Sequence, residues 1–131
     1  MEAKLKHLDF IQGVVNRLST NSFLLKGWSV VLVSGLFILS GEESEESFAY
    51  LALIPSVVIW GLDGYFLWQE RLFRRLYELV RLKKVDEIDF SMSTAAVSDR
   101  RPSYISSVFS MTLIVFHATV VGSIFVVTVL L

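Results

Sequence analysis

The sequence predicts an all-α membrane protein with three transmembrane helices, an N-terminal amphipathic helix and a cytosolic extension of the second span. Hydrophobic residues make up 53% of the 131 residues, and the mean hydropathy of +0.59 is above the average of soluble domains. The apolar residues gather in three runs, each near the roughly 20 residues with which a helix crosses a bilayer. The basic residues all fall in segments that one topology keeps on the same side. We therefore treat residues 1–131 as a single membrane domain.

The first predicted element is an amphipathic helix over residues 2–20. Its apolar side chains recur at intervals of three and four: Leu8, Ile11, Val15 and Leu18. The Ser-Thr-Asn run at 19–21 predicts a break or a cap before the first span. This helix can lie on the inner membrane surface. We favour a second arrangement, in which its apolar stripe packs on the extension of the second span, because two amphipathic helices can bury each other's faces.

The three spans are predicted at 22–40, 47–69 and 102–131. The first carries Lys26 near its inner edge, and the second contains one charged residue before its end, Asp63. Pro55 lies inside the second span and predicts a bend there, because proline removes a helical hydrogen bond. The third span has no Lys, Arg, Asp or Glu after Arg101. These three segments form the membrane part of the prediction.

Residues 70–84 continue the second span as a cytosolic helix. Tyr65 and Trp68 mark the membrane interface, where aromatic residues are enriched. Beyond them an apolar stripe follows helical spacing, with Leu72, Phe73, Leu76, Leu79 and Val80. Residues 85–101 have no clear period and predict a cytosolic loop.

The basic residues predict the topology. Four of them precede the first predicted span or lie at its inner edge, and the other eight lie between Arg71 and Arg101. The turn between the first two spans, "GEESEES", is purely acidic. Positive residues stay cytoplasmic, so the N-terminus and the 70–101 segment are expected inside. The acidic turn and the C-terminus are expected outside.

Several function classes are excluded by what the sequence lacks. It has no cysteine, and its two histidines, His7 and His117, lie far apart, so no zinc-binding pattern is present. No phosphate loop, metalloprotease, hydrolase or kinase motif occurs. We predict no enzyme activity, no catalytic residue, no metal site and no cofactor. A net charge of −1 gives no nucleic-acid footprint.

The candidate functional residues inside the membrane are Lys26, Asp63 and His117. Lys26 and Asp63 fall at comparable depth on antiparallel spans, where an unpaired charge is costly. They can pair with each other and tie the hairpin together or line a polar path. The alternative is that Lys26 reaches the head groups and Asp63 bonds at the interface. His117 is expected as a neutral hydrogen-bonding residue between helices, and a proton relay is the second reading.

Small residues predict close helix packing, within one chain or between copies. The candidates are Gly27, Gly35, Gly64, Ala118 and Gly122, of which the last two give a small-xxx-small step. Because three helices enclose no pore by themselves, we expect a homo-oligomer in the lipid bilayer.

A cytosolic basic face is formed by six residues: Arg71, Arg74, Arg75, Arg81, Lys83 and Lys84. It can accept a small anionic ligand or a signalling protein. The alternative is ordinary positive-inside charge with contacts to anionic lipids, which we favour.

Two stretches, "LDFIQGVVNRLSTNSFLLKGWSVVLVSGLF" at 8–37 and "WGLDGYFLWQERLFRRLYELVR" at 60–81, carry a resemblance. They resemble a family of small bacterial membrane proteins that accompany TIR-like or nucleotide-signalling proteins in antiphage systems. The layout is similar to the SLATT class of membrane effectors, although the third span departs from its two-span plan. The resemblance is strongest at Asn21, Lys26, Gly27, Trp28, Asp63, Gly64, Gln69, Glu70 and Arg71.

The resemblance implies an oligomeric effector of bacterial defence in the inner (plasma) membrane, which forms or gates a pore. A partner or small signal would act on the cytosolic part. The alternative is a non-conducting anchor or accessory subunit that recruits a cytosolic partner. A proton or ion transporter ranks third, because the spans offer few ionisable groups.

Overall fold

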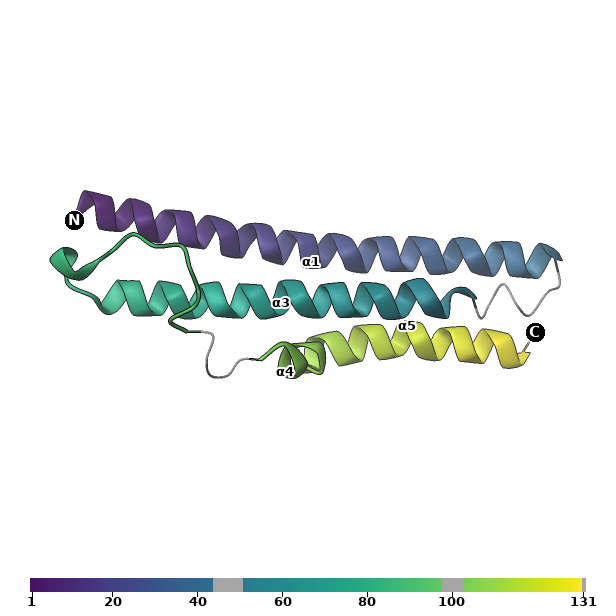
Figure 1. The fold of residues 1–131 in the computed structure, drawn as a ribbon. Coiled ribbons are helices and arrows are strands. Elements are labelled where there is room, and N and C mark those ends of the chain that lie inside the picture. The colour runs from purple at the N-terminus through teal and green to yellow at the C-terminus, as the bar shows by residue number, and fades with distance from the viewer. Residues whose placement is uncertain (44–50, 98–102, 131) are drawn as a thin grey trace.

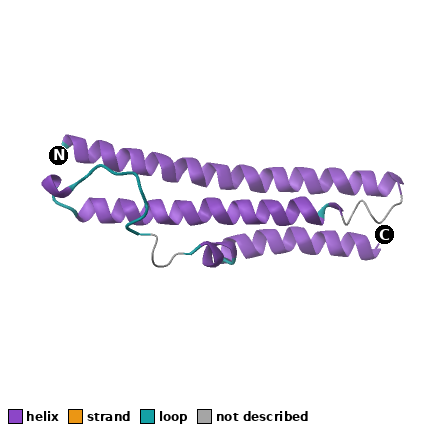
Figure 2. Ribbon diagram, in the orientation of Figure 1, coloured by secondary structure: helices purple, strands orange, loops and turns teal. Residues whose placement is uncertain are grey.

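The protein is described by a computed structural model over residues 1–43, 51–97 and 103–130. These residues form α1 (Glu2–Glu43), α3 (Leu53–Leu82), the short 3₁₀ helix η1 (Val85–Glu87), α4 (Tyr104–Val108) and α5 (Met111–Leu130). Figure 2 shows helices and loops, and no strand, in this part of the chain. The predicted all-helical class is confirmed.

Helix α3 is the central element of the fold. It runs antiparallel to α1 along most of its length, and it also packs on α4 and α5 (Figure 1). At the N-terminal end of the molecule, α1 and α3 extend beyond α4 and α5. We call this end, made of residues 2–18, 72–82 and the loop 83–97, the projecting bundle. The remaining parts of α1 and α3 form a three-helix bundle with α5.

Helix α1 is continuous where the sequence predicted two helices, 2–20 and 22–40. One residue of the run expected to break it, Thr20, is bonded inside the helix, and Ser22, just beyond the run, is bonded to a neighbouring helix. Thr20 donates its hydroxyl to the backbone oxygen of Asn16 at 3.0 Å, one turn back, and Ser22 bonds to Asp63 on α3. A 42-residue helix is about 60 Å long, about twice the bilayer's hydrocarbon thickness.

The sequence predicted that Pro55 bends the interior of a helix, and this prediction was wrong. Helix α3 begins at Leu53, so Pro55 lies in its first turn. The backbone N–H groups of a first turn have no helical partner, and proline is tolerated there. From Leu53 to Leu82 the helix runs without interruption, so the predicted extension of the second span into 70–84 agrees with α3 up to Leu82.

The third apolar segment, predicted as one span over 102–131, is divided into α4 and α5. Ser103 caps α4 through a capping box with Ser106. The helix ends at Val108, whose backbone oxygen accepts the indole N–H of Trp60 at 3.0 Å. In a continuous helix that oxygen would accept an N–H from four residues further on. Residues 98–102 of the predicted loop and span lie outside the described residues.

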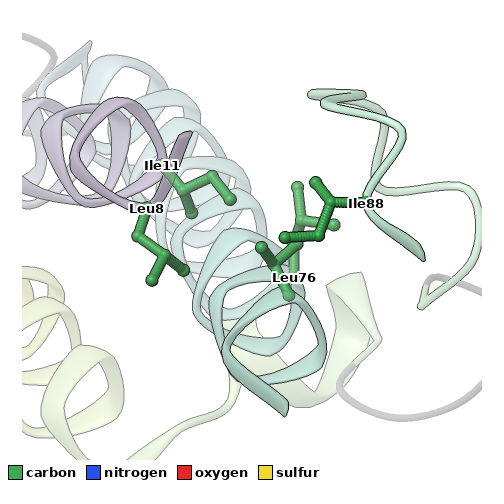
Figure 3. Close-up of a cluster of buried hydrophobic side chains, with 5 residues drawn as sticks. Leu8, Ile11, Leu76 and Ile88 are labelled. Atoms are coloured by element: carbon green, nitrogen blue, oxygen red, sulfur yellow. The ribbon is translucent and has the colours of Figure 1, made fainter. Parts of the chain in front are cut away.

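The projecting bundle has its own apolar core, as the favoured sequence interpretation expected (Figure 3). Leu8 and Ile11 of α1 pack with Leu76 and Val80 of α3, and Ile88 of the loop covers them. Leu79, which the sequence placed in the apolar stripe of residues 70–84, is 37% exposed and is not part of this core. Burial on α3 follows a spacing of four through Leu72, Leu76 and Val80.

Polar contacts hold the loop 83–97 and the C-terminal end of α3 against α1. The Lys4 ammonium donates to the backbone oxygens of Arg81 at 3.0 Å and of Lys83 at 2.8 Å, as cations do at helix C-termini. The Nε2 atom of buried His7 lies 3.1 Å from the Ser91 backbone oxygen. The Ser91 N–H donates to Asp89 and lowers the pKa of that carboxyl.

Two of the described helices, α1 and α5, are long and apolar enough to cross a membrane. Only 11% of the most apolar stretch of α1 and 28% of that of α5 is buried within the structure. In a water-soluble bundle these faces would be packed against other elements. Helix α3 does not meet the same test of length and composition, because its apolar half carries Asp63 and soon reaches Glu70.

Candidate functional site

Asp63 on α3 joins the three long helices at one point. Its side chain has no exposed surface. Its Oδ2 atom lies 2.7 Å from the Nζ atom of Lys26 on α1 and 2.7 Å from the Nε2 atom of His117 on α5. The hydroxyl of Ser22, also on α1, donates to Oδ1. Both carboxylate oxygens therefore have partners, which is the condition for keeping a charge inside apolar helices.

Lys26 reaches Asp63 with support from its own helix and from α5. Its Nζ atom donates to the Ser22 hydroxyl at 2.8 Å, one turn earlier on α1. The ammonium also lies 6.0 Å from the ring centroid of Phe116, within the range of a cation–π contact. Its side chain remains 19% exposed, while those of Asp63 and His117 are 0% and 1% exposed. Of these three residues, Lys26 is therefore the one whose side chain retains exposed surface.

His117 is enclosed by aromatic rings. The indole of Trp60 stacks on it at 5.6 Å with planes 10° apart, and the ring of Phe116 meets its edge at 5.0 Å. These two rings and the Asp63 carboxylate together surround the imidazole. We name Ser22, Lys26, Trp60, Asp63 and His117 the polar cluster.

The structure brings the three predicted membrane residues into one site. Lys26 and Asp63 are paired, which is the first of the two arrangements considered from the sequence. The contact of His117 with Asp63 was not predicted. Ser22 and Trp60 were also missed, although their spacing gave a signal: Ser22 lies four residues before Lys26 and Trp60 three before Asp63, distances that share a helix face.

The predicted packing glycines divide into two groups. A Cβ atom on Gly64 would lie 3.1 Å from the Cα atom of Val108, so only glycine lets α4 approach α3 here. A Cβ atom on Gly27, Gly35 or Gly122 would meet nothing within 4 Å among the described residues. Ala118 is also exposed. These four positions leave backbone accessible on the outer surfaces of α1 and α5.

The predicted basic face does not form one open site. Arg74 pairs with Glu70 at 3.3 Å, and Arg81 pairs with Glu78 at 2.8 Å. Arg71 donates to the Ser107 hydroxyl at 3.5 Å, which links α3 to α4. Of the remaining three residues, Arg75 and Lys84 are exposed and Lys83 is half-buried.

Two cavities follow α1 on either side of Lys26. The smaller, of about 400 Å³, lies next to the projecting bundle and has a mixed lining, with the polar residues Ser19, Ser22, Lys26, Glu70 and Thr112 beside Phe23, Leu67 and Leu113. The larger, of about 710 Å³, lies between α1 and α5 towards their other ends, and its walls are mostly apolar, among them Val30, Val33, Phe37, Phe116 and Val120. Thr112 lines both cavities.

Within residues 1–43, 51–97 and 103–130, no group of His, Cys, Asp and Glu side chains could hold a metal ion. The Asp63–His117 pair is accompanied by a lysine and a serine that both bind the carboxylate, so no activated nucleophile is apparent. The contacts of the cluster are ion pairing and hydrogen bonding.

Comparisons with protein-family models, curated proteins and solved structures found no match to this chain.

Proposed function

We propose that the chain is an integral membrane protein whose helices α1, α3 and α5 all cross the inner membrane of a bacterium. Copies of it assemble and form or gate a pore as the effector of a defence system. The observation that carries the proposal is the polar cluster, because ionisable groups held between apolar helices mark ion pathways in membrane proteins. Its assignment to defence rests on the resemblance of residues 8–37 and 60–81.

The third crossing is supported by the position of α3. It lies against both α1 and α5, the two helices that are apolar enough to span. Asp63 is the charged residue in its apolar half and is neutralised by Lys26. A helix whose charge is paired inside the bundle can share the bilayer with its neighbours. The basic residues then give a cytoplasmic N-terminus and projecting bundle, and an outer C-terminus.

Assembly is supported by the outer faces of α1 and α5. Gly27, Gly35 and Gly122 are uncovered, and small residues let the backbones of neighbouring membrane helices approach closely. The polar cluster is enclosed within one chain, so a water-filled pore wide enough for hydrated ions would need several copies of the chain around it.

The pore is tested by flux and membrane potential. Purified protein in liposomes, and induced protein in bacteria with and without its neighbouring genes, is followed with a potential-sensitive dye. We expect depolarisation under the triggering condition, and oligomers in detergent. Gly122→Ile, which adds bulk to an uncovered face, should abolish both depolarisation and oligomer formation. Gly13→Ala in the projecting bundle should leave both unchanged. A potential that holds under every condition, or a strict monomer, contradicts the pore.

A non-conducting anchor that recruits a cytosolic protein is the second candidate. The projecting bundle favours it, because α1 and α3 run from the apolar region into it without a break. A photo-crosslinking amino acid at exposed Arg17 should then capture the partner. Capture together with an unchanged membrane potential would support the anchor over the pore.

The signal, a small anionic ligand or a cytosolic protein, would act on the projecting bundle. Because Arg71, Arg74 and Arg81 already have partners within the chain, we place such a contact at Lys84 and its neighbours. Lys84→Glu should abolish the response to the signal without changing folding, and an unaltered response would move the contact elsewhere.

A further inference from the structure

Of the two cavities described above, only the smaller is lined by residues of the polar cluster. The smaller cavity reaches Ser22 and Lys26, and the larger begins beyond Phe116. Asp63 and His117 line neither cavity among the residues described and are almost fully buried. Any proton that enters the cluster from the smaller cavity must therefore pass through Lys26 or the Ser22 hydroxyl.

We propose that the polar cluster is a proton-transfer site loaded from the smaller cavity, and that protons are the species conducted. The inference rests on the proposed pore and specifies what moves through it. The contact that carries it is the 2.7 Å distance between Lys26 Nζ and Asp63 Oδ2, at which a proton can pass directly between the two atoms.

The transfer step is balanced within these groups. An N–H bond of the Lys26 ammonium breaks as an O–H bond forms on Asp63. A hydronium ion in the smaller cavity then gives a proton to the neutral amine and becomes water. His117 accepts the added proton from the cluster and holds it as imidazolium, so that Asp63 returns to its charged form.

The groups that face this step favour it. From α1, Lys26 and Ser22 bind the carboxylate, and from α5, His117 does so. The face of Trp60 lies against His117, the residue that holds the added proton in this step. Glu70, itself paired with Arg74, places negative charge on the wall of the smaller cavity and attracts cations into it.

The proposed path for a proton from the polar cluster to the larger cavity passes Phe116. The ring of Phe116 lies beside Lys26 and against the edge of His117, and it lines the larger cavity. Phe116 therefore touches both the polar cluster and the larger cavity, whose lining also includes Ser34, Thr119 and Ser123. Rotation of Phe116 would connect the two cavities, which makes this residue the gate of the proposed path.

The test measures proton flux in liposomes that contain the protein. The vesicles hold an internal pH dye, and a potassium gradient with valinomycin sets the potential. We expect acidification that depends on the protein, and passive potassium flux, measured without valinomycin, that stays at the level of empty vesicles.

Two variants separate proton transfer from a structural role. Lys26→Arg keeps a cation for Asp63, but a guanidinium does not release its proton, so proton flux should fall by about tenfold or more. The proton flux of Asp63→Asn should fall by a similar factor, whereas Asp63→Glu should retain the proton flux. Glu78→Gln changes an exposed carboxylate in the projecting bundle and should conduct like the original chain. Each variant is checked for its oligomer size and unfolding temperature.

Each outcome has a distinct meaning. Potassium flux equal to proton flux overturns the proton assignment and leaves the pore. Flux that is unchanged in a folded Lys26→Arg variant overturns the transfer step. The absence of any flux or depolarisation, in vesicles and in cells under every trigger, overturns both the inference and the proposed pore.

Discussion

The indole of Trp60 stacks on the imidazole of His117, with ring centroids 5.6 Å apart and planes 10° from parallel. The same indole donates its N–H to the backbone oxygen of Val108 at 3.0 Å. One side chain of α3 therefore holds α5 through His117 and the last turn of α4 through Val108. Trp60 thus takes part in two features: it bonds to α4 at the point where the third apolar segment is divided, and it belongs to the polar cluster.

Replacing Trp60 with phenylalanine separates these two contacts. Trp60→Phe keeps an aromatic face for His117 but leaves the Val108 oxygen without its donor. We expect a loss of about 1–3 kcal/mol, the cost of an unsatisfied buried group. Unfolding in mixed micelles followed by circular dichroism measures it. Trp28→Phe, at a position 66% exposed, is the control and should change stability by less than about 0.5 kcal/mol.

Removing one partner of the Lys26–Asp63 pair should cost more than removing both. Asp63→Leu leaves the Lys26 charge without its partner and should destabilise the chain by about 3–5 kcal/mol. Adding Lys26→Met removes that charge, and the double variant should recover most of the loss. The unfolding transitions of the two variants are compared in the same detergent. Equal losses would show that the pairing has no part in stability.

The core of the projecting bundle can be tested with two leucines on α3. Leu76→Ala opens a cavity in the buried cluster and should cost about 2–5 kcal/mol. Leu79→Ala changes a side chain that is 37% exposed and should cost much less. Hydrogen exchange should quicken over residues 2–18 and 72–82 in the first variant alone. Similar exchange in both would contradict the packing of α1 on α3 at this end.

Gly64 should tolerate no side chain, in contrast to Gly13. Gly64→Ala presses a methyl group into Val108 and should destabilise the chain by about 1–3 kcal/mol. Gly13→Ala adds a methyl group where nothing lies within 4 Å of it, and alanine is the better helix former. That variant should be more stable by about 0.5–1 kcal/mol. Thermal unfolding of the two proteins gives the comparison.

The absence of cysteine makes the topology directly testable. Lys84→Cys and Leu130→Cys each introduce one exposed thiol. The first lies in the projecting bundle and the second at the end of α5. A membrane-impermeant maleimide added to intact cells should label position 130 and should reach position 84 only after lysis. Labelling of both positions from outside would contradict the proposed orientation.

Sequence patterns predicted the parts of the fold that depend on hydrophobic periodicity. The stripe through Leu8 and Ile11 and the spacing of Leu72 and Leu76 indicated two helices that bury each other's faces, and the structure packs them so. The continuity of α1 was not predictable from the Ser-Thr-Asn run, because the same side chains can cap a helix or bond within it. In α1 the Thr20 hydroxyl bonds within the helix, to the backbone oxygen of Asn16.

The polar cluster was predictable only in part for a similar reason. Topology placed Lys26 and Asp63 at one depth, but depth alone does not decide whether two side chains point at each other. His117 joined them because α5 begins after a break at Phe109 and Ser110, which fixes the rotation of α5 about its axis. That break follows from a side-chain bond of Trp60 and from the missing Cβ of Gly64, and neither leaves a periodic signal.

The unbroken course of α1 makes its two ends move as one. Lys26, which is paired with Asp63, divides α1 into two parts, 2–26 and 26–43. Tilting α1 about Lys26 by about 10° would swing each tip by about 5 Å, given a rise of about 1.5 Å per residue. In the proposed membrane arrangement, a displacement of the N-terminal end of α1 would reach its other end without an intermediate joint.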